Sequence, residues 1–123
     1  MKQIVLVFVG GGIGSILRYA FANLLNNYEN GVPYGTLLAN ILGSLLIGII
    51  LGLGLKSEIL SQNTMLFLAT GFCGGFTTFS TFAYENHLFL RAGDLMSFAF
   101  YTLASFVIGF SMVFLGMWLA KFF

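Results

Sequence analysis

The sequence contains very little charge. Only 7% of its 123 residues are charged and 59% are hydrophobic, whereas about a quarter of the residues of a soluble domain are charged. A chain of this length has too small a core to hide so much apolar surface from water, so part of that surface must face lipid. The net charge of +1, without any basic cluster, argues against nucleic acid as a partner.

Cysteine and histidine are nearly absent as well. The single Cys73 leaves no disulfide within the chain, and with His87 it forms no metal-binding spacing. We expect His87 to be a solvated loop residue. The glycines of GGGIGS lack the Lys-Ser/Thr of a phosphate-binding loop and a preceding strand, so we expect no nucleotide. No set of nucleophile, base and orienting group is recognisable, and we do not expect an enzyme.

Long uncharged runs make up most of the chain. They cover residues 30–55, 59–84 and 95–120, and each exceeds the ~20 residues that a helix needs to cross a bilayer. A shorter run at residues 3–17 becomes a full span if Arg18 is accepted within it. We therefore predict an all-α membrane protein with one transmembrane domain over residues 1–123. Its four transmembrane helices are expected at about 4–26, 33–55, 62–85 and 95–121.

The positive charges barely define an orientation in the membrane. Four spans place both termini on one side of the membrane, together with Lys2, Lys56 and Lys121. The other side has Arg91, and also Arg18 if its side chain extends toward that end. Three charges against two is a weak bias under the positive-inside rule. A fixed topology and a dual topology therefore both remain open, and the second would permit an antiparallel homodimer. Since four helices enclose little room for a polar path, we expect at least two subunits.

Polar residues inside the predicted spans recur every four residues, and polar groups at this depth are costly enough to indicate function. The two stripes are Thr36, Asn40 and Ser44 in the second helix, and Ser97, Tyr101 and Ser105 in the fourth. The amide of Asn40 offers donors either to a neighbouring helix or to a passing ion. Arg18 either snorkels to the interface or provides a fixed positive charge that draws anions.

The third span contains the stretch GFCGGFTTFSTF, residues 71–82. Gly74 and Gly75, followed by Thr77 and Thr78, weaken a helix. This predicts a break near the midplane, where irregular backbone persists only if it is buried in protein or lines a cavity. Carbonyl oxygens exposed by such a break can hold a cation. The simpler explanation of the glycines is close helix packing.

Aromatic and hydroxyl side chains follow the predicted break. Phe79 and Phe82 are three residues apart and share a face, with Ser80 and Thr81 between them. A phenyl ring has a positive edge, so ring edges and hydroxyl donors together favour an anion path. In a sequence with 15 phenylalanines, ordinary core packing is the alternative.

Three segments, GGGIGSILRY, GTLLANILGSLLIG and GFCGGFTTFSTFAYE, together resemble the Fluc (CrcB) family of small fluoride ion channels. The resemblance covers the first three helices in order, and the fourth agrees in Tyr101 and Ser105. It implies an antiparallel, dual-topology homodimer in the bacterial inner (plasma) membrane. Each dimer would have two fluoride-selective pathways that passively export fluoride from the cytoplasm and so reduce its toxicity.

The resemblance also implies roles for individual residues. A structural sodium ion, which is not transported, would lie at the dimer centre on the backbone carbonyls of Gly74 and Thr77 from both subunits. Phe79 and Phe82 would line the pathway with their ring edges toward fluoride. Further pathway positions implied in the same way are Arg18, Asn40, Ser80, Thr81, Tyr101 and Ser105. Glu85 matches an acidic residue of the family without a clear role.

Two other functions are compatible with four apolar helices. A small multidrug-type proton-coupled antiporter can also have dual topology, but it needs a carboxylate inside the membrane. The first helix has none, and the predicted position of Glu85 is at a helix end. The remaining alternative is a membrane subunit that transports nothing, in which the glycines serve assembly.

Overall fold

The computed structural model describes residues 1–29, 31–56 and 58–123, and every regular element within them is helical. The elements in chain order are α1 (Lys2–Leu25), α2 (Tyr34–Gly54), α3 (Gln62–Met65), η1 (Leu66–Cys73), α4 (Gly74–Phe76), α5 (Phe79–Ala92), α6 (Leu95–Leu119) and η2 (Ala120–Phe122). They form four segments that are long and apolar enough to cross a membrane: Lys2–Leu25, Tyr34–Gly54, Gln62–Ala92 and Leu95–Phe122. The predicted all-α class and four spans are confirmed.

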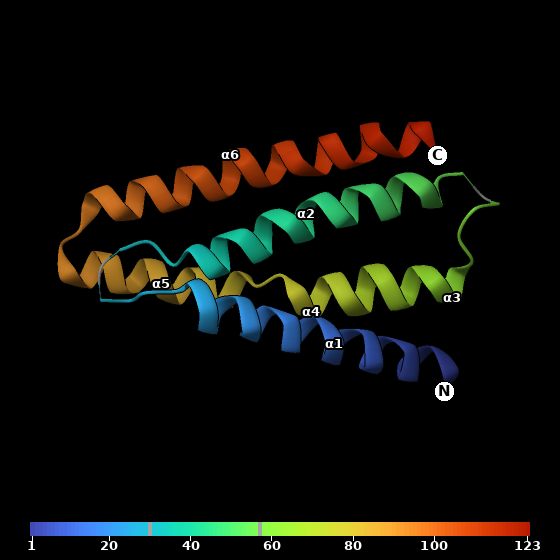
Figure 1. Cartoon of the computed structure of the whole chain (residues 1–123), viewed down its shortest axis with the longest axis horizontal. Coiled ribbons are helices and arrows are strands. Elements are labelled where there is room, and N and C mark those ends of the chain that lie inside the picture. Colours follow the sequence, from blue (N-terminus) through green and yellow to red (C-terminus); the bar gives the residue numbers. More distant parts are fainter. Residues whose placement is uncertain (30, 57) are drawn as a thin grey trace.

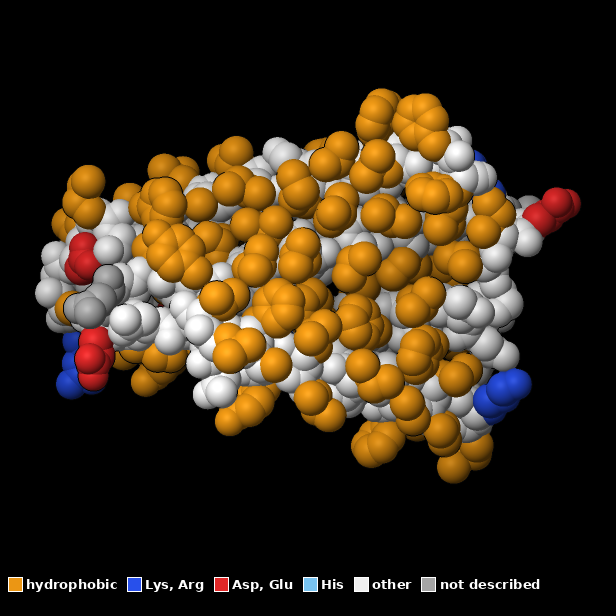
Figure 2. Space-filling model, viewed as in Figure 1, with side chains coloured by type: hydrophobic (Ala, Val, Ile, Leu, Met, Phe, Trp, Pro, Cys, Tyr) orange, Lys and Arg blue, Asp and Glu red, His pale blue; other side chains and the backbone are white. Residues whose placement is uncertain are grey.

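The four segments lie side by side, with both termini at the same end of the molecule (Figure 1). α2 packs along α6, and α1 packs against η1 and α4. Figure 2 shows one face of the molecule, on which apolar side chains cover the middle and charged side chains lie at the two ends. This distribution is typical of a surface that meets lipid between two aqueous interfaces.

The third segment changes its backbone geometry along its length. It begins with Ser61, whose hydroxyl accepts a hydrogen bond from Thr64 N at 3.1 Å, and continues from α3 through the π-helical η1 to α4. Thr77 (φ −89°, ψ 155°) and Thr78 (φ −150°, ψ 120°) are extended and separate α4 from α5. Thr78 Oγ1 then caps α5 by accepting from Thr81 N at 3.2 Å. Two extended residues thus interrupt the helical geometry of this segment.

α5 extends further than the sequence predicted. We expected the third helix to end at residue 85, but α5 ends at Ala92 and is followed by Gly93 in the left-handed region, with φ 74°. Glu85 and His87 therefore lie within a helix. His87 is exposed, though not in the loop that we predicted, and Glu85 is only 2% exposed. The predicted end was wrong because polar side chains do not stop a helix; here the backbone turns at a glycine.

Close backbone contact explains why one residue of the adjacent pair Gly74 and Gly75 is glycine. A Cβ on Gly75 would collide with the carbonyl oxygen of Gly11 in α1. A Cβ on Gly74 would meet nothing closer than Ala69 O, at 4.0 Å. Close packing therefore accounts for Gly75, as the simpler explanation proposed, but it gives no reason for glycine at position 74.

The second and fourth segments are held together by close helix packing and by hydrogen bonds of one lysine side chain. A Cβ on Gly48 or on Gly116 would collide with a carbonyl oxygen of the facing helix, so the axes of α2 and α6 lie close together. At the end that carries the chain termini, Lys56 Nζ donates hydrogen bonds to Ala120 O (2.9 Å) and Lys121 O (3.2 Å). A cation at a helix C-terminus also interacts favourably with the helix dipole.

Candidate ion-binding groove

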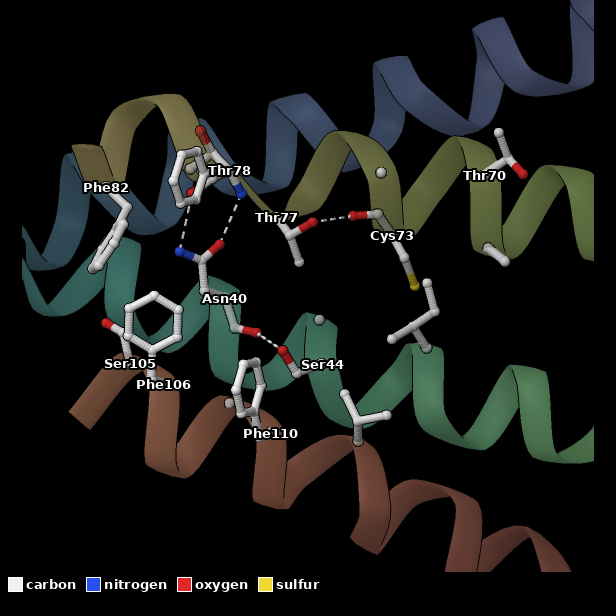
Figure 3. Close-up of a pocket in the computed structure, with 17 residues that line it drawn as sticks. Asn40, Ser44, Thr70, Cys73, Thr77, Thr78, Phe82, Ser105, Phe106 and Phe110 are labelled. Carbon is white, nitrogen blue, oxygen red and sulfur yellow. Dashed lines mark hydrogen bonds between the residues drawn. The ribbon is translucent and has the colours of Figure 1, made fainter. Parts of the chain in front are cut away.

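A groove of about 460 Å³ runs between α2, the third segment and α6 (Figure 3). Among the described residues that line it, no side chain is charged. The polar and glycine positions of its lining include Asn40, Ser44, Thr70, Gly74, Thr77, Thr78 and Ser105, and its aromatic lining is Phe79, Phe82, Phe106 and Phe110. The groove thus combines aromatic rings with a small number of uncharged polar groups.

Asn40 binds the backbone of the interruption with both ends of its amide (Figure 3). Its Oδ1 accepts from Thr78 N at 2.7 Å, and its Nδ2 donates to Thr78 O at 3.1 Å. These bonds replace the helical partners that an extended residue lacks. An amide nitrogen carries two hydrogens, so Asn40 retains one donor besides the bond to Thr78 O. Ser44 Oγ donates to Asn40 O at 2.7 Å.

The two predicted phenylalanines both line the groove but differ in exposure. Their ring centroids are 5.9 Å apart. Phe82 is 8% exposed and packs on Tyr101, at 5.1 Å, and edge-to-face on Phe106, at 6.0 Å and 87°. Phe79 is 74% exposed. Phe82 is therefore both a core residue and part of the groove wall, while the ring of Phe79 stands largely uncovered.

The carbonyl oxygens around the interruption differ in their partners. Cys73 O accepts from Thr77 N (3.0 Å) and Thr77 Oγ1 (2.8 Å), and Gly75 O accepts from Arg18 Nε (2.9 Å). Within the described residues, no side chain donates to the carbonyl oxygens of Gly74 and Thr77, and no backbone N–H outside the regular helical bonds does so. Both residues line the groove. These two carbonyls therefore fit the chemistry of a cation site, because oxygen dipoles without donors can bind an alkali ion.

A metal site made of side chains is not found in the described part of the chain, where no group of three or more His, Cys, Asp or Glu could hold a metal ion. Backbone carbonyls and the hydroxyl and amide oxygens of the groove are the ligands that remain. One chain provides the carbonyls of Gly74 and Thr77, which are fewer oxygens than an alkali cation normally takes. Further oxygens, from water, side chains or another chain, would be needed to complete a coordination shell.

Three of the predicted hydroxyl residues lie in or near the groove. Ser105 lines it, and its Oγ is buried without a hydrogen-bond partner among the described residues. Ser80 and Thr81 lie in the first turn of α5, where their hydroxyl oxygens are 3.4 Å and 3.1 Å from Thr78 Oγ1. These two residues do not line the groove of a single chain.

Arg18 lies behind the interruption rather than in the groove. Its Nε donates to the carbonyl oxygen of Gly75, 57 residues away along the chain, and it does not line the groove of the single chain. A carbonyl near the end of α4 thereby gains a charged donor. The structure connects Arg18 to the backbone of the third segment, a contact that neither of our two interpretations included.

Glu85 forms a second polar site, which the sequence did not predict. Its Oε1 accepts from Tyr101 Oη at 2.7 Å, and its Oε2 accepts from Thr36 Oγ1 at 2.9 Å and Tyr28 Oη at 3.0 Å. We call these four residues the Glu85 cluster. Burial, and then the charge of Glu85, raise the pKa of Tyr28. Tyr101 has no exposed surface and reaches the groove only through its contact with Phe82.

Comparison with known proteins decides the family. The family described as "CrcB-like protein, Camphor Resistance (CrcB)" matches residues 5–117. The chain belongs to this family.

Several relatives carry the name "Fluoride-specific ion channel FluC". One from Gloeothece citriformis (strain PCC 7424) is 48% identical over 123 residues, which is 98% of each chain. One from Azobacteroides pseudotrichonymphae genomovar. CFP2 is 42% identical over 124 residues, covering 100% of this chain and 99% of the relative. A third, from Chlorobaculum tepidum, is 43% identical over 121 residues, 98% of this chain and 96% of the relative. The resemblance stated from the motifs is confirmed.

Membership of the CrcB-like family, with four segments able to span a bilayer, makes the chain a multi-pass membrane protein. Within that frame, sequence reasoning missed the Glu85 cluster because it placed Glu85 at a helix end. The signal that could have found it was present: Thr36 and Tyr101 belong to the two polar stripes, and Glu85 lies three residues after Phe82. Residues three or four positions apart share a helix face, so Thr36, Tyr101 and Glu85 lie on the same faces as the residues of the two stripes and Phe82.

Proposed function

We propose that this chain forms a fluoride-selective ion channel that passively exports fluoride from the cytoplasm. The observation that carries the proposal is the uncharged groove, whose lining includes Asn40, Ser105 and the exposed ring of Phe79. Fluoride holds its water tightly, so a path must offer other donors. Amide and hydroxyl hydrogens and positive ring edges are such donors. The names of the relatives point to the same ion.

The working unit of this channel would be an antiparallel homodimer in the bacterial plasma membrane. Three features support it: the uncovered ring of Phe79, the incomplete set of carbonyl ligands on one chain, and the weak charge bias, which permits both orientations. A second copy would close each groove and create two pathways. Thr77 and Thr78 would then form the family's break in the third helix, near the bilayer midplane.

Passive flow is sufficient for protection. In an acidic medium the weak acid HF crosses the membrane and dissociates in the more alkaline cytoplasm, which traps fluoride there. A selective fluoride leak would let the anion return down its electrochemical gradient and lower its cytoplasmic concentration. No coupled energy source is required for this direction.

The experiment that tests the function uses liposomes that contain only this purified protein. They are loaded with fluoride, or with chloride as the control, and efflux is followed with ion-selective electrodes after a potassium ionophore removes the electrical limit. We expect rapid fluoride efflux and chloride efflux close to that of empty liposomes. Equal efflux of both ions, or none of either, would refute the proposal.

The structural sodium ion is the second part of the proposal. The carbonyls of Gly74 and Thr77 from two chains would hold it, and its charge would offset the oxygen dipoles that converge at the dimer centre. Replacing sodium by N-methylglucamine should lower the thermal unfolding midpoint and the dimer fraction, since bound ligand stabilises the folded state. Radioactive sodium should not cross the liposome membrane. A midpoint that is independent of sodium would count against the site.

A proton-coupled multidrug antiporter is less well supported than a channel. Glu85 is the buried carboxylate that such a mechanism needs, but it is bound by three hydroxyl groups and does not line the groove. The names of the relatives also refer to a channel. Drug-dependent proton release from the purified protein would favour the antiporter.

A further inference from the structure

Asn26, directly after α1, links the α1–α2 connection to the Glu85 cluster. Its Oδ1 accepts from Thr36 N at 3.1 Å, while its Nδ2 donates to Thr36 Oγ1 at 3.1 Å and to Tyr28 Oη at 2.9 Å. The residue before α2 is Pro33, whose side chain provides no cap. Asn26 therefore satisfies a backbone N–H in the first turn of α2, which a local cap would normally do.

The chemistry of these groups determines the direction of every bond. A backbone N–H can only donate, so the oxygen of Asn26 must face Thr36 N and its NH₂ group must face the two hydroxyls. That NH₂ group has two hydrogens and no acceptor. The hydroxyl oxygens of Thr36 and Tyr28 therefore accept from Asn26, and each still has its own hydrogen to donate. The acceptor within reach of both is Glu85 Oε2, at 2.9 Å and 3.0 Å.

We infer that Asn26 is a positioning residue that turns the hydroxyl hydrogens of Thr36 and Tyr28 toward Glu85. With Tyr101 donating to the other oxygen, the carboxylate is held from three sides. Tyr101 in turn packs on Phe82, which lines the groove. Asn26 thus acts on the groove wall through the cluster, without contact with the groove itself.

The direction of these bonds matters because the hydrogen-bond partners of Glu85 are all hydroxyl groups, which can donate or accept. Two further acidic residues, Glu29 and Asp94, line with Glu85 a cavity of about 190 Å³, and no basic residue is among the described residues of its lining. Arg91 belongs to the last turn of α5, and Arg18 is bound to Gly75. If the two hydroxyls turned their hydrogens away, Glu85 Oε2 would face oxygen lone pairs.

The first test replaces the amide by a carboxylate of the same shape. Asn26→Asp keeps the acceptor for Thr36 N, but it now accepts from the two hydroxyls and withdraws them from Glu85. The matched control is Asn27→Asp, which adds the same charge one residue away, where the side-chain Oδ1 accepts from Glu29 N. We expect Asn26→Asp to lower the thermal unfolding midpoint by about 5 °C and to reduce fluoride efflux at least tenfold. Asn27→Asp should change fluoride efflux less than twofold.

The second test reverses the whole network. Asn26→Asp combined with Glu85→Gln places the acceptor at residue 26 and the NH₂ group at residue 85, so both hydroxyls can donate toward residue 26 and accept from residue 85. The double variant should regain most of the midpoint, or of the protein yield, that Asn26→Asp loses. Double-variant losses equal to the sum of the single losses would overturn the inference, as would equal effects of the two Asn→Asp changes.

The expected effect on efflux rests on the proposed function, but the double-mutant cycle of unfolding midpoints does not. Wild-type protein that fails to conduct fluoride would refute the channel and leave the cycle of midpoints to decide the role of Asn26. Wild-type protein that conducts, with an additive cycle, would refute only the positioning role.

Discussion

The groove and the Glu85 cluster are two polar regions of one membrane protein, and they satisfy their polar groups in opposite ways. In the cluster, both carboxylate oxygens accept from hydroxyl groups of other elements, and the carboxylate is 2% exposed. In the groove, the Oγ of Ser105 is buried without a partner among the described residues, and no side chain of these residues donates to the carbonyl oxygens of Gly74 and Thr77. Buried polar groups are normally paired.

This difference indicates which region is complete in a single chain. A closed network such as the Glu85 cluster fixes the positions of the elements that it joins. Unpaired groups at membrane depth are costly, and in the channel that we propose an ion or a second chain would meet those of the groove. We therefore assign ion contact to the groove and positioning to the cluster. The following predictions test that division.

The largest effect is expected in the groove at Asn40. Asn40→Asp removes the donor to Thr78 O, places a carboxylate beside that carbonyl, and adds negative charge to an anion path. We expect fluoride efflux to fall about 100-fold, consistent with the loss of a buried hydrogen bond and added repulsion. Asn63→Asp, in α3 outside the groove, is the control and should conduct normally. Normal efflux through Asn40→Asp would place Asn40 off the path.

A smaller effect is expected at the uncovered ring. Phe79→Ile keeps an apolar side chain but removes the positive ring edge, and because Phe79 is 74% exposed, a single chain loses little packing. We expect efflux to fall about tenfold, the upper range for one aromatic interaction, with the dimer intact in size-exclusion chromatography. Phe114→Ile, which changes a phenylalanine that is 73% exposed on α6, should leave efflux unchanged. An unaltered rate in Phe79→Ile would contradict the ring-edge role.

Phe82→Ile should reduce efflux as well, but it also removes the contacts with Tyr101 and Phe106. Its unfolding midpoint should therefore fall, unlike that of Phe79→Ile. Equal unfolding midpoints in the two variants would show that the difference in burial between these rings does not affect the stability of the protein.

Among the variants of this comparison, the smallest effect on conduction is expected at Tyr101, where a single donor of the cluster is removed. Tyr101→Phe leaves Glu85 Oε1 without its hydroxyl donor, which should cost about 1–3 kcal/mol and lower the thermal unfolding midpoint more than it lowers efflux. Tyr19→Phe, at a position that is 71% exposed, should change neither quantity. A Tyr101→Phe protein with a normal midpoint and abolished efflux would show that Tyr101 contacts the ion directly, and the division between groove and cluster would be wrong.

Much of the fold could be predicted from local pattern. Uncharged runs define four spans, because crossing a bilayer needs only a sufficiently long apolar helix. The glycine and threonine residues of 71–82 indicated where the third segment becomes irregular. The four-residue spacing placed Asn40 and Ser105 in two polar stripes, and in the structure both residues line the groove.

Partners far apart in the chain could not be predicted in the same way. The bond from Arg18 to Gly75 and the bonds from Asn40 to Thr78 join residues 57 and 38 positions apart. Their existence depends on which helices are neighbours and on the rotation of each. The end of α5 was misplaced for a related reason: in the sequence Glu85 resembles an interfacial charge, and only the structure shows that α2, α6 and the α1–α2 connection supply its donors.

The sequence by itself determined that this protein crosses a membrane with four helices, since the cost of exposing apolar side chains to water and backbone groups to lipid depends on composition and length alone. Only the tertiary structure decided that Gly75 is a packing glycine and Gly74 is not, that Asn26 caps a helix to which it does not belong, and that Glu85 is buried. Each of these depends on atoms brought together from separate helices, and hydrogen bonds and close contacts are decided by tenths of an ångström that residue spacing does not encode.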